Sequence, residues 1–155
     1  MRMVRAWIEA MRLRTLPVSL AGVICGWGCA AHTGRFHWIP AIFCLLIALF
    51  AQIASNFGNE YFDYKNGLDR KGRDGFRRGV TEGDIAPGAM LGATLALLVA
   101  VGIIGVALCI VTVNFWLLLP GVAILVFALA YSAGPYPLSH HGLGDIAVVI
   151  FFGLV

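Results

Sequence analysis

The sequence predicts an all-α protein, a polytopic bundle of transmembrane helices. Of its 155 residues, 60% are hydrophobic and only 12% are charged, whereas a soluble domain carries about 25% charged residues. The apolar residues gather in several long runs, and a helix of roughly 20 such residues crosses a bilayer. These two observations exclude an ordinary soluble domain and predict about four complete spans plus the start of a fifth.

The N-terminal arm, residues 2–14, predicts a short amphipathic helix that lies on the membrane surface. Trp7, Ile8, Met11 and Leu13 would face lipid, while the arginines between them would stay in water. The arm therefore predicts an anchor at the membrane surface that leads into the first span.

Four apolar runs long enough to cross a bilayer follow the arm. The expected spans are residues 15–31, 38–58, 87–111 and 115–133. A Gly/Pro-rich link, residues 132–144, then leads to a fifth run that starts at Asp145 and reaches the last residue after about half of the length needed. We therefore expect the chain to be the N-terminal part of a longer membrane domain whose C-terminal half is absent.

The segment 59–86 concentrates the charge of the chain, with six of the 11 Lys and Arg residues and six of the 8 acids. The N-terminal arm holds four more basic residues, whereas the turn at 32–37 has one and the turn at 112–114 has none. The positive-inside rule therefore predicts that the arm and the 59–86 segment are cytoplasmic. The expected location is the inner, or cytoplasmic, membrane.

A row of amide and carboxylate side chains lies at the end of the second predicted span. Gln52, Asn56, Asn59 and Asp63 are spaced by four, three and four residues, which puts them on one helix face. Polar groups in a bilayer are costly without partners. For the two deeper residues, Gln52 and Asn56, substrate binding and hydrogen bonding to a neighbouring helix are equally compatible with this position.

The helix is expected to continue through Asp63 and to end near Asn66 and Gly67, a favourable C-terminal pair. Asp69 follows this break and can fold back toward Asp63. Oxygen donors of this kind suit Mg²⁺, which is usually held by one or two carboxylates together with substrate phosphates. The sequence thus predicts a small acidic cup at the cytoplasmic end of the bundle.

Basic residues follow this cup directly, and the combination indicates the kind of ligand. Acids and bases together at the rim of an apolar cavity suit a metal-bound anion with an apolar tail, such as a prenyl diphosphate. Asn59, Asp63 and Asp69 would share Mg²⁺ with the diphosphate, and Arg77 and Arg78 would neutralise its remaining charge as it leaves. The bases between Asp69 and Arg77 are equally well explained as a solvated loop that fixes the topology.

Several motifs, in order along the chain, resemble those of the UbiA superfamily of intramembrane prenyltransferases. The motifs are Arg14-Thr15-Leu16-Pro17, Asn59-Glu60-Tyr61-Phe62-Asp63 with Gly67 and Asp69, Arg77-Arg78, and Tyr131-Ser132-Ala133-Gly134-Pro135-Tyr136-Pro137-Leu138 running into Gly142-Leu143-Gly144-Asp145. They are most similar to the branch that prenylates 1,4-dihydroxy-2-naphthoate in menaquinone synthesis.

This resemblance implies a nine-span bundle with a central cavity, in which residues 1–155 are the N-terminal part of a single domain. It implies Mg²⁺ as cofactor, a polyprenyl diphosphate and an aromatic acceptor as partners, a bilayer around the protein, and no nucleic acid. The catalytic and metal-binding residues would be Asn59, Asp63 and Asp69. The substrate-binding residues would be Asn56, Lys65, Arg77, Arg78, Tyr131 and Asp145.

Two departures from the family pattern bear on the site. Position 60 is Glu where the family commonly has Asp, and its longer carboxylate is expected still to face the site. The second acidic motif of the family belongs to its C-terminal half, which this chain does not reach. The isolated 155 residues are therefore expected to be inactive.

Two other functions fit parts of the pattern. One is a prenyltransferase of the same family with another acceptor, such as 4-hydroxybenzoate, haem or a chlorin. The other is a small non-enzymatic membrane carrier or cation-binding protein that uses the acidic cup as a gate. A carrier would be expected to place an ionisable residue near mid-membrane, and the spans at 15–31, 87–111 and 115–133 contain no Asp, Glu, Lys or Arg. Neither the isoprenoid length nor the oligomeric state follows from the sequence.

Overall fold

The computed structural model describes residues 2–72 and 77–130. All regular elements in these ranges are helical, as predicted. Their order is α1 (Arg2–Ala10), η1 (Leu13–Thr15), α2 (Leu16–His32), α3 (Trp38–Lys65), α4 (Gly79–Glu82), α5 (Pro87–Thr112), η2 (Phe115–Leu117) and α6 (Leu118–Ala130).

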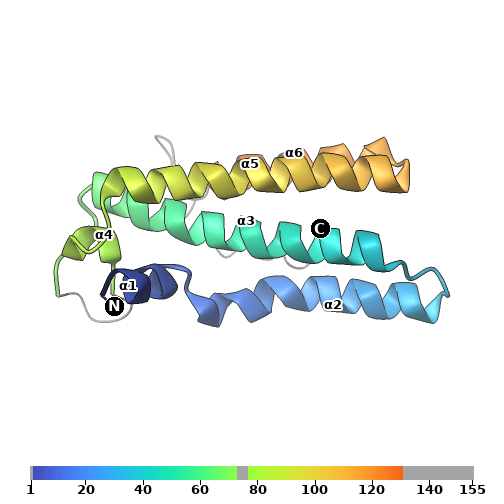
Figure 1. Cartoon of the computed structure of the whole chain (residues 1–155), viewed down its shortest axis with the longest axis horizontal. Helices are drawn as coiled ribbons and strands as arrows, with labels where there is room; N and C mark the ends of the chain where they lie inside the picture. Colours follow the sequence, from blue (N-terminus) through green and yellow to red (C-terminus); the bar gives the residue numbers. More distant parts are fainter. Residues whose placement is uncertain (1, 73–76, 131–155) are drawn as a thin grey trace.

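Helix α3 lies at the centre of the bundle, between α2 on one side and α5 and α6 on the other (Figure 1). The two short helices, α1 and α4, lie side by side at one end of the bundle. Three helical stretches are long and apolar enough to cross a membrane: Arg2–His32, Trp38–Lys65 and Pro87–Thr112. The fourth predicted span, residues 115–133, contains η2 and α6, and its last three residues and the predicted fifth run lie outside the described residues.

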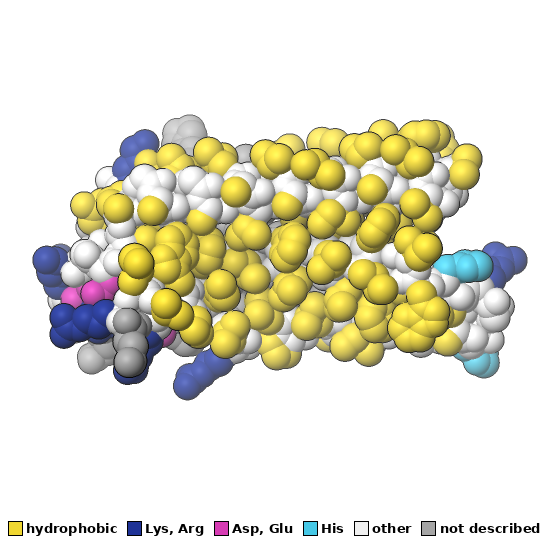
Figure 2. Space-filling view, viewed as in Figure 1, with side chains coloured by type: hydrophobic (Ala, Val, Ile, Leu, Met, Phe, Trp, Pro, Cys, Tyr) yellow, Lys and Arg dark blue, Asp and Glu magenta, His cyan; other side chains and the backbone are white. Residues whose placement is uncertain are grey.

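The lateral surface of the bundle is hydrophobic, and charged side chains gather mainly at the end where α1 and α4 lie (Figure 2). On α5, for example, Val99, Ile103 and Ile110 are each more than 60% exposed. Exposed aliphatic side chains along a helix of this length are what a lipid environment requires. This surface identifies the chain as an integral membrane protein.

The second predicted span and the polar row form one continuous helix. Helix α3 runs for 28 residues from Trp38 to Lys65. Its C-cap is Asn66, and Gly67 follows with a positive φ of 68°, a conformation that glycine adopts without steric cost. The predicted end of the helix is confirmed, and the chain reverses there so that Asp69 returns toward α3.

The predicted surface helix at 2–14 is shorter than expected. Helix α1 ends at Ala10, and Arg12 adopts a left-handed conformation with φ 50° before η1 begins. This reversal turns the chain from the end of the bundle into α2. The periodic pattern of apolar and basic residues continues through the reversal, so the pattern alone could not reveal it.

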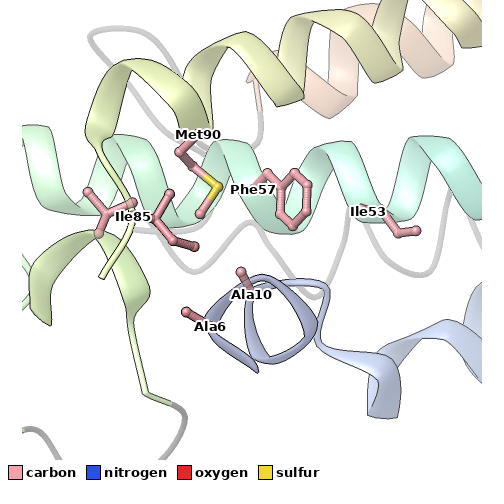
Figure 3. Packing of buried hydrophobic residues seen from close by; sticks show 7 residues of the cluster. Ala6, Ala10, Ile53, Phe57, Ile85 and Met90 are labelled. Atoms are coloured by element: carbon pink, nitrogen blue, oxygen red, sulfur yellow. The ribbon is translucent and has the colours of Figure 1, made fainter. Parts of the chain in front are cut away.

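The face of α1 that was expected to contact lipid packs partly against protein. Ala6 and Ala10 are almost fully buried in a hydrophobic cluster with Phe57 of α3 and Met90 of α5 (Figure 3). The Trp7 ring meets the Phe57 ring edge-on at 5.3 Å between centroids. The small side chains of Ala6 and Ala10 allow α1 to approach α3 and α5 closely, and this packing fixes the position of α1 at the end of the bundle.

Of the four side chains assigned to lipid, two are accordingly corrected. Trp7 and Met11 are partly buried against the hydrophobic cluster, because α1 lies across the end of the bundle. Ile8 and Leu13 remain about half exposed, as an interfacial position requires.

Candidate active site

Arg78 lies between the two predicted acidic residues, Asp63 and Asp69. Its Nη2 atom is 3.2 Å from Asp63 Oδ2, and its Nε atom is 3.3 Å from Asp69 Oδ2. The side chains of Arg78, Asp63 and Asp69 are only 12%, 10% and 1% exposed. The expectation that Asp69 folds back toward Asp63 is confirmed, and one guanidinium group joins the two carboxylates in a place largely shielded from water.

Asn59 extends this cluster toward the N-terminal arm. In the amide orientation that satisfies its neighbours, Asn59 Nδ2 donates to Asp63 Oδ2 at 3.0 Å. Its Oδ1 atom accepts from Arg12 Nη1 at 3.2 Å. The left-handed turn at Arg12 thus directs this guanidinium to α3. We refer to Arg12, Asn59, Asp63, Asp69 and Arg78 as the charged cluster.

Glu60 does not join the charged cluster through any hydrogen bond found in the described residues. Its side chain is 1% exposed, and its Oε1 atom accepts a hydrogen bond from the Val80 backbone N–H at 3.0 Å. Val80 belongs to α4, in the loop between α3 and α5. The Glu60 carboxylate thus binds the loop through this bond, and Arg12 and Asp69 of the charged cluster lie near enough to interact with its charge.

Asn56 and Gln52 make hydrogen bonds to the neighbouring part of the chain. Ser19 Oγ donates to Gln52 Oε1 at 2.7 Å. Asn56 Nδ2 donates to the Met11 carbonyl oxygen at 2.9 Å and to Thr15 Oγ1 at 3.1 Å. Of the two interpretations left open by the sequence, the structure therefore favours a bond between helices, since these contacts satisfy polar groups that lipid cannot.

The two adjacent arginines lie in different environments. Arg78 is in the charged cluster, whereas Arg77 pairs with Asp84 and its side chain is half exposed. Lys65 is also exposed, and it lines an open pocket of about 620 Å³ together with Asp69 and other residues of the loop. Arg77 thus pairs with an acid that is not among the three predicted metal ligands, while Lys65 shares a pocket with one of them, Asp69.

Two predicted substrate-binding residues, Tyr131 and Asp145, lie outside the described residues.

The donor set at the cluster is compatible with a hard cation. Within residues 2–72 and 77–130, no three His, Cys, Asp or Glu side chains lie close enough together to hold a metal ion. Asn59, Asp63 and Asp69 supply one amide and two carboxylates, the oxygen ligands that Mg²⁺ accepts alongside water and phosphate. In this structure Arg78 contacts both carboxylates, and Arg12 supplies the second positive charge of the cluster.

Sequence reasoning missed the part that the N-terminal arm plays in the site. Arg12, Met11 and Thr15 all contact the polar face of α3. The available signal was the position of the Arg-Thr-Leu-Pro motif directly before the first span, which contains Thr15. It could not reveal the contact because the arm and α3 are about 40 residues apart in the chain.

Apolar helices that carry a shielded carboxylate–arginine cluster at one end define an integral membrane protein with a polar site at the edge of its bundle. Residues 19–155 match the UbiA prenyltransferase family, and the chain belongs to this family. No solved structure matches the chain.

The relatives found among curated proteins all carry one name. The chain is 36% identical to the 1,4-dihydroxy-2-naphthoate octaprenyltransferase of Escherichia coli, over 96% of this chain and 50% of the relative. It is 34% identical to the protein of that name from Haemophilus influenzae, over 97% of this chain and 51% of the relative. The chain thus spans about half the length of the curated relatives it matches.

Proposed function

We propose that the chain forms the N-terminal part of a Mg²⁺-dependent prenyltransferase of menaquinone synthesis, whose direct product is demethylmenaquinone in its hydroquinone form. The enzyme would transfer a polyprenyl group from polyprenyl diphosphate to 1,4-dihydroxy-2-naphthoate, with loss of diphosphate and of the naphthoate carboxyl group. The observation that carries this proposal is the charged cluster at the end of α3, in a chain whose relatives are named for this reaction.

The charged cluster suits the binding of a diphosphate at the membrane edge. The isoprenoid tail is apolar and belongs in the bilayer, whereas the diphosphate needs cations. In the absence of substrate, the two carboxylates hold Arg78 in position, and Arg78 and Arg12 together balance their charge. On binding, Arg78 would exchange part of these contacts for diphosphate oxygens, which form strong bidentate hydrogen bonds with guanidinium groups.

Asn59, Asp63 and Asp69 would hold Mg²⁺ in the substrate complex. The metal, when bound, would neutralise the charge that the leaving diphosphate gains as the allylic C–O bond breaks. The role of the chain's own residues is to hold the diphosphate in register with the cation, and Arg78 and Arg12 supply the nearby positive charge. The second acidic motif of the family would come from outside these 155 residues.

The bundle end that carries the charged cluster is proposed to face the cytoplasm. The supporting observation is the distribution of charge, since 10 of the 11 Lys and Arg residues fall in the arm and the 59–86 segment and only Arg35 lies elsewhere. In a bacterial cell this orientation corresponds to the inner membrane. It would give the site access to Mg²⁺ and to the water-soluble naphthoate.

The test is prenyl transfer in membranes that contain this chain, alone and within its full gene context. The assay supplies Mg²⁺, a labelled polyprenyl diphosphate and dihydroxynaphthoate. Product is expected only in the full context, because the second acidic motif belongs to the C-terminal half of the family's domain. If 4-hydroxybenzoate is prenylated instead, the acceptor assignment is wrong; if no aromatic acceptor is prenylated, the enzymatic proposal is wrong.

A further inference from the structure

We infer that Glu60 is a positioning residue that fastens the α3–α5 loop to α3 and thereby holds Arg78 between Asp63 and Asp69. The inference deepens the proposed function and rests on it for the catalytic consequence. It also departs from the simplest interpretation of the motif, in which every acid at this end of α3 would face a metal ion.

The contact that carries the inference joins two elements far apart in sequence. Glu60 Oε1 accepts from the Val80 backbone N–H at 3.0 Å, and the bond is buried. Val80 is two residues beyond Arg78, at the start of α4. The first N–H groups of a helix have no partner within the helix, so the carboxylate satisfies one of them and also fixes the chain beside Arg78.

The packing around this bond leaves the Glu60 carboxylate little freedom. Val80 and Ile85 are each 3% exposed. A Cβ atom added to Gly79 would lie 2.9 Å from Ile85 Cδ1 and 3.5 Å from the Ala6 side chain. The start of α4 is therefore held closely between α1 and the rest of the loop, and Glu60 meets its backbone from the α3 side.

The position of Glu60 on α3 explains why the loop and the charged cluster are coupled. Glu60 and Asp63 are three residues apart, so they are neighbours on the helix surface. Asp63 binds the Arg78 side chain, and Glu60 binds the backbone two residues later. The same turn of α3 thus binds both the Arg78 guanidinium and the backbone next to Arg78. An aspartate at position 60 would have one methylene group fewer and would not reach the Val80 N–H in the same way.

The first arm of the experiment measures the loop directly, without any activity. The protein, in its full gene context and in detergent, is treated with trypsin, and cleavage after Arg70 and Lys71 is followed by mass spectrometry. We expect Glu60→Gln to be cleaved like the wild type, since the amide oxygen can still accept from Val80. Glu60→Ala and Glu60→Asp should be cleaved about tenfold faster, because a buried N–H loses its acceptor.

The second arm measures steady-state kinetics of prenyl transfer. Glu60→Ala and Glu60→Asp should raise KM for the polyprenyl diphosphate about tenfold while kcat changes less than about threefold, as expected for loss of positioning. Glu60→Gln should keep both constants and the wild-type Mg²⁺ requirement. Glu9→Ala is the matched control, since it removes an acid that pairs with Arg5 on the exposed side of α1.

The outcomes separate the possible errors. If Glu60→Gln loses activity and needs more Mg²⁺ while trypsin cleavage is unchanged in all variants, Glu60 is a metal ligand and the inference is wrong. If the Glu60→Ala protein does not accumulate, the Glu60→Asp protein is tested alone. Trypsin cleavage of Glu60→Asp at the wild-type rate would then overturn the inference. If the wild-type protein transfers no prenyl group, the proposed function fails, whereas the trypsin comparison still decides whether Glu60 fastens the loop.

Discussion

Two consecutive arginines, Arg77 and Arg78, lie in different surroundings, and their substitution is therefore expected to affect activity to different extents. Arg78 contacts two shielded carboxylates, whereas Arg77 pairs with one acid at the exposed side of the loop. In the full gene context, Arg78→Ala should lower kcat/KM for polyprenyl transfer at least about a hundredfold, because it removes a positioned cation and leaves buried acids uncompensated.

The matched control is Arg77→Ala, which should lower kcat/KM less than about fivefold, because its ion pair is half exposed. Steady-state kinetics on membranes with equal amounts of protein measure both variants. Equal losses from the two substitutions would contradict the different environments of these side chains.

A second pair of substitutions compares Asp63, in the charged cluster, with Arg70, a charged residue of the nearby loop. Asp63→Ala should abolish turnover, because this acid contacts both Asn59 and Arg78 and is a proposed Mg²⁺ ligand. Arg70→Ala should change turnover less than about twofold, because Arg70 is an exposed loop residue. Product formation from labelled polyprenyl diphosphate measures both, and an equally large effect of Arg70→Ala would count against the assigned site.

At this scale the sequence predicted the residues of the acidic cup and part of their surroundings. Helical spacing was sufficient to predict that Asn59 and Asp63 lie on one face of α3. The helix break at Gly67 was sufficient to predict that Asp69 folds back toward them. Spacing could not predict which of two adjacent arginines turns inward, since a loop has no fixed period. Spacing also could not predict the hydrogen bond that Glu60 accepts from the Val80 backbone N–H, because this group belongs to a loop.

Among the helices, α1 offers the clearest test of packing. Ala10 is 1% exposed in the hydrophobic cluster, so Ala10→Leu should overpack it and cost about 1–3 kcal/mol of stability. We expect a lower midpoint of thermal unfolding in detergent and faster trypsin cleavage of the arm. Ile8→Ala is the control, since Ile8 is 47% exposed and should change the midpoint little.

If Ala10→Leu instead melts like the wild type, α1 is not held against the bundle end as described.

The long helices were predictable to within a few residues and the short ones were not. The length of each apolar run, Gly67 and the proline that opens α5 define α3 and α5 almost completely. The end of α1 depends on tertiary packing and on the left-handed backbone conformation of Arg12. The sequence has no glycine or asparagine there that would have predicted this turn. Helix α4 is only four residues long and depends on its contacts with α1 and α3.

For the molecule as a whole, the proposed metal should matter for chemistry and not for folding. The described helices are held by apolar packing and hydrogen bonds, and within residues 2–72 and 77–130 Arg78 and Arg12 balance the charges of Asp63 and Asp69. Chelation with EDTA should therefore stop prenyl transfer in the full context while the helical circular dichroism stays unchanged. Added Mg²⁺ should restore activity.

A loss of helical signal on chelation would mean that the cation is structural. Persistent transfer without any divalent cation would contradict the proposed role of Asn59, Asp63 and Asp69.

The hydrogen bonds between α2 and α3 bear on how the protein enters the membrane. Gln52 and Asn56 would each be costly in a helix that partitions into lipid alone. Their partners are Ser19, near the start of α2, and Thr15, the last residue of η1 directly before α2. The two helices are therefore suited to leave the insertion machinery together as one helical hairpin, with their polar groups already paired before the later helices arrive.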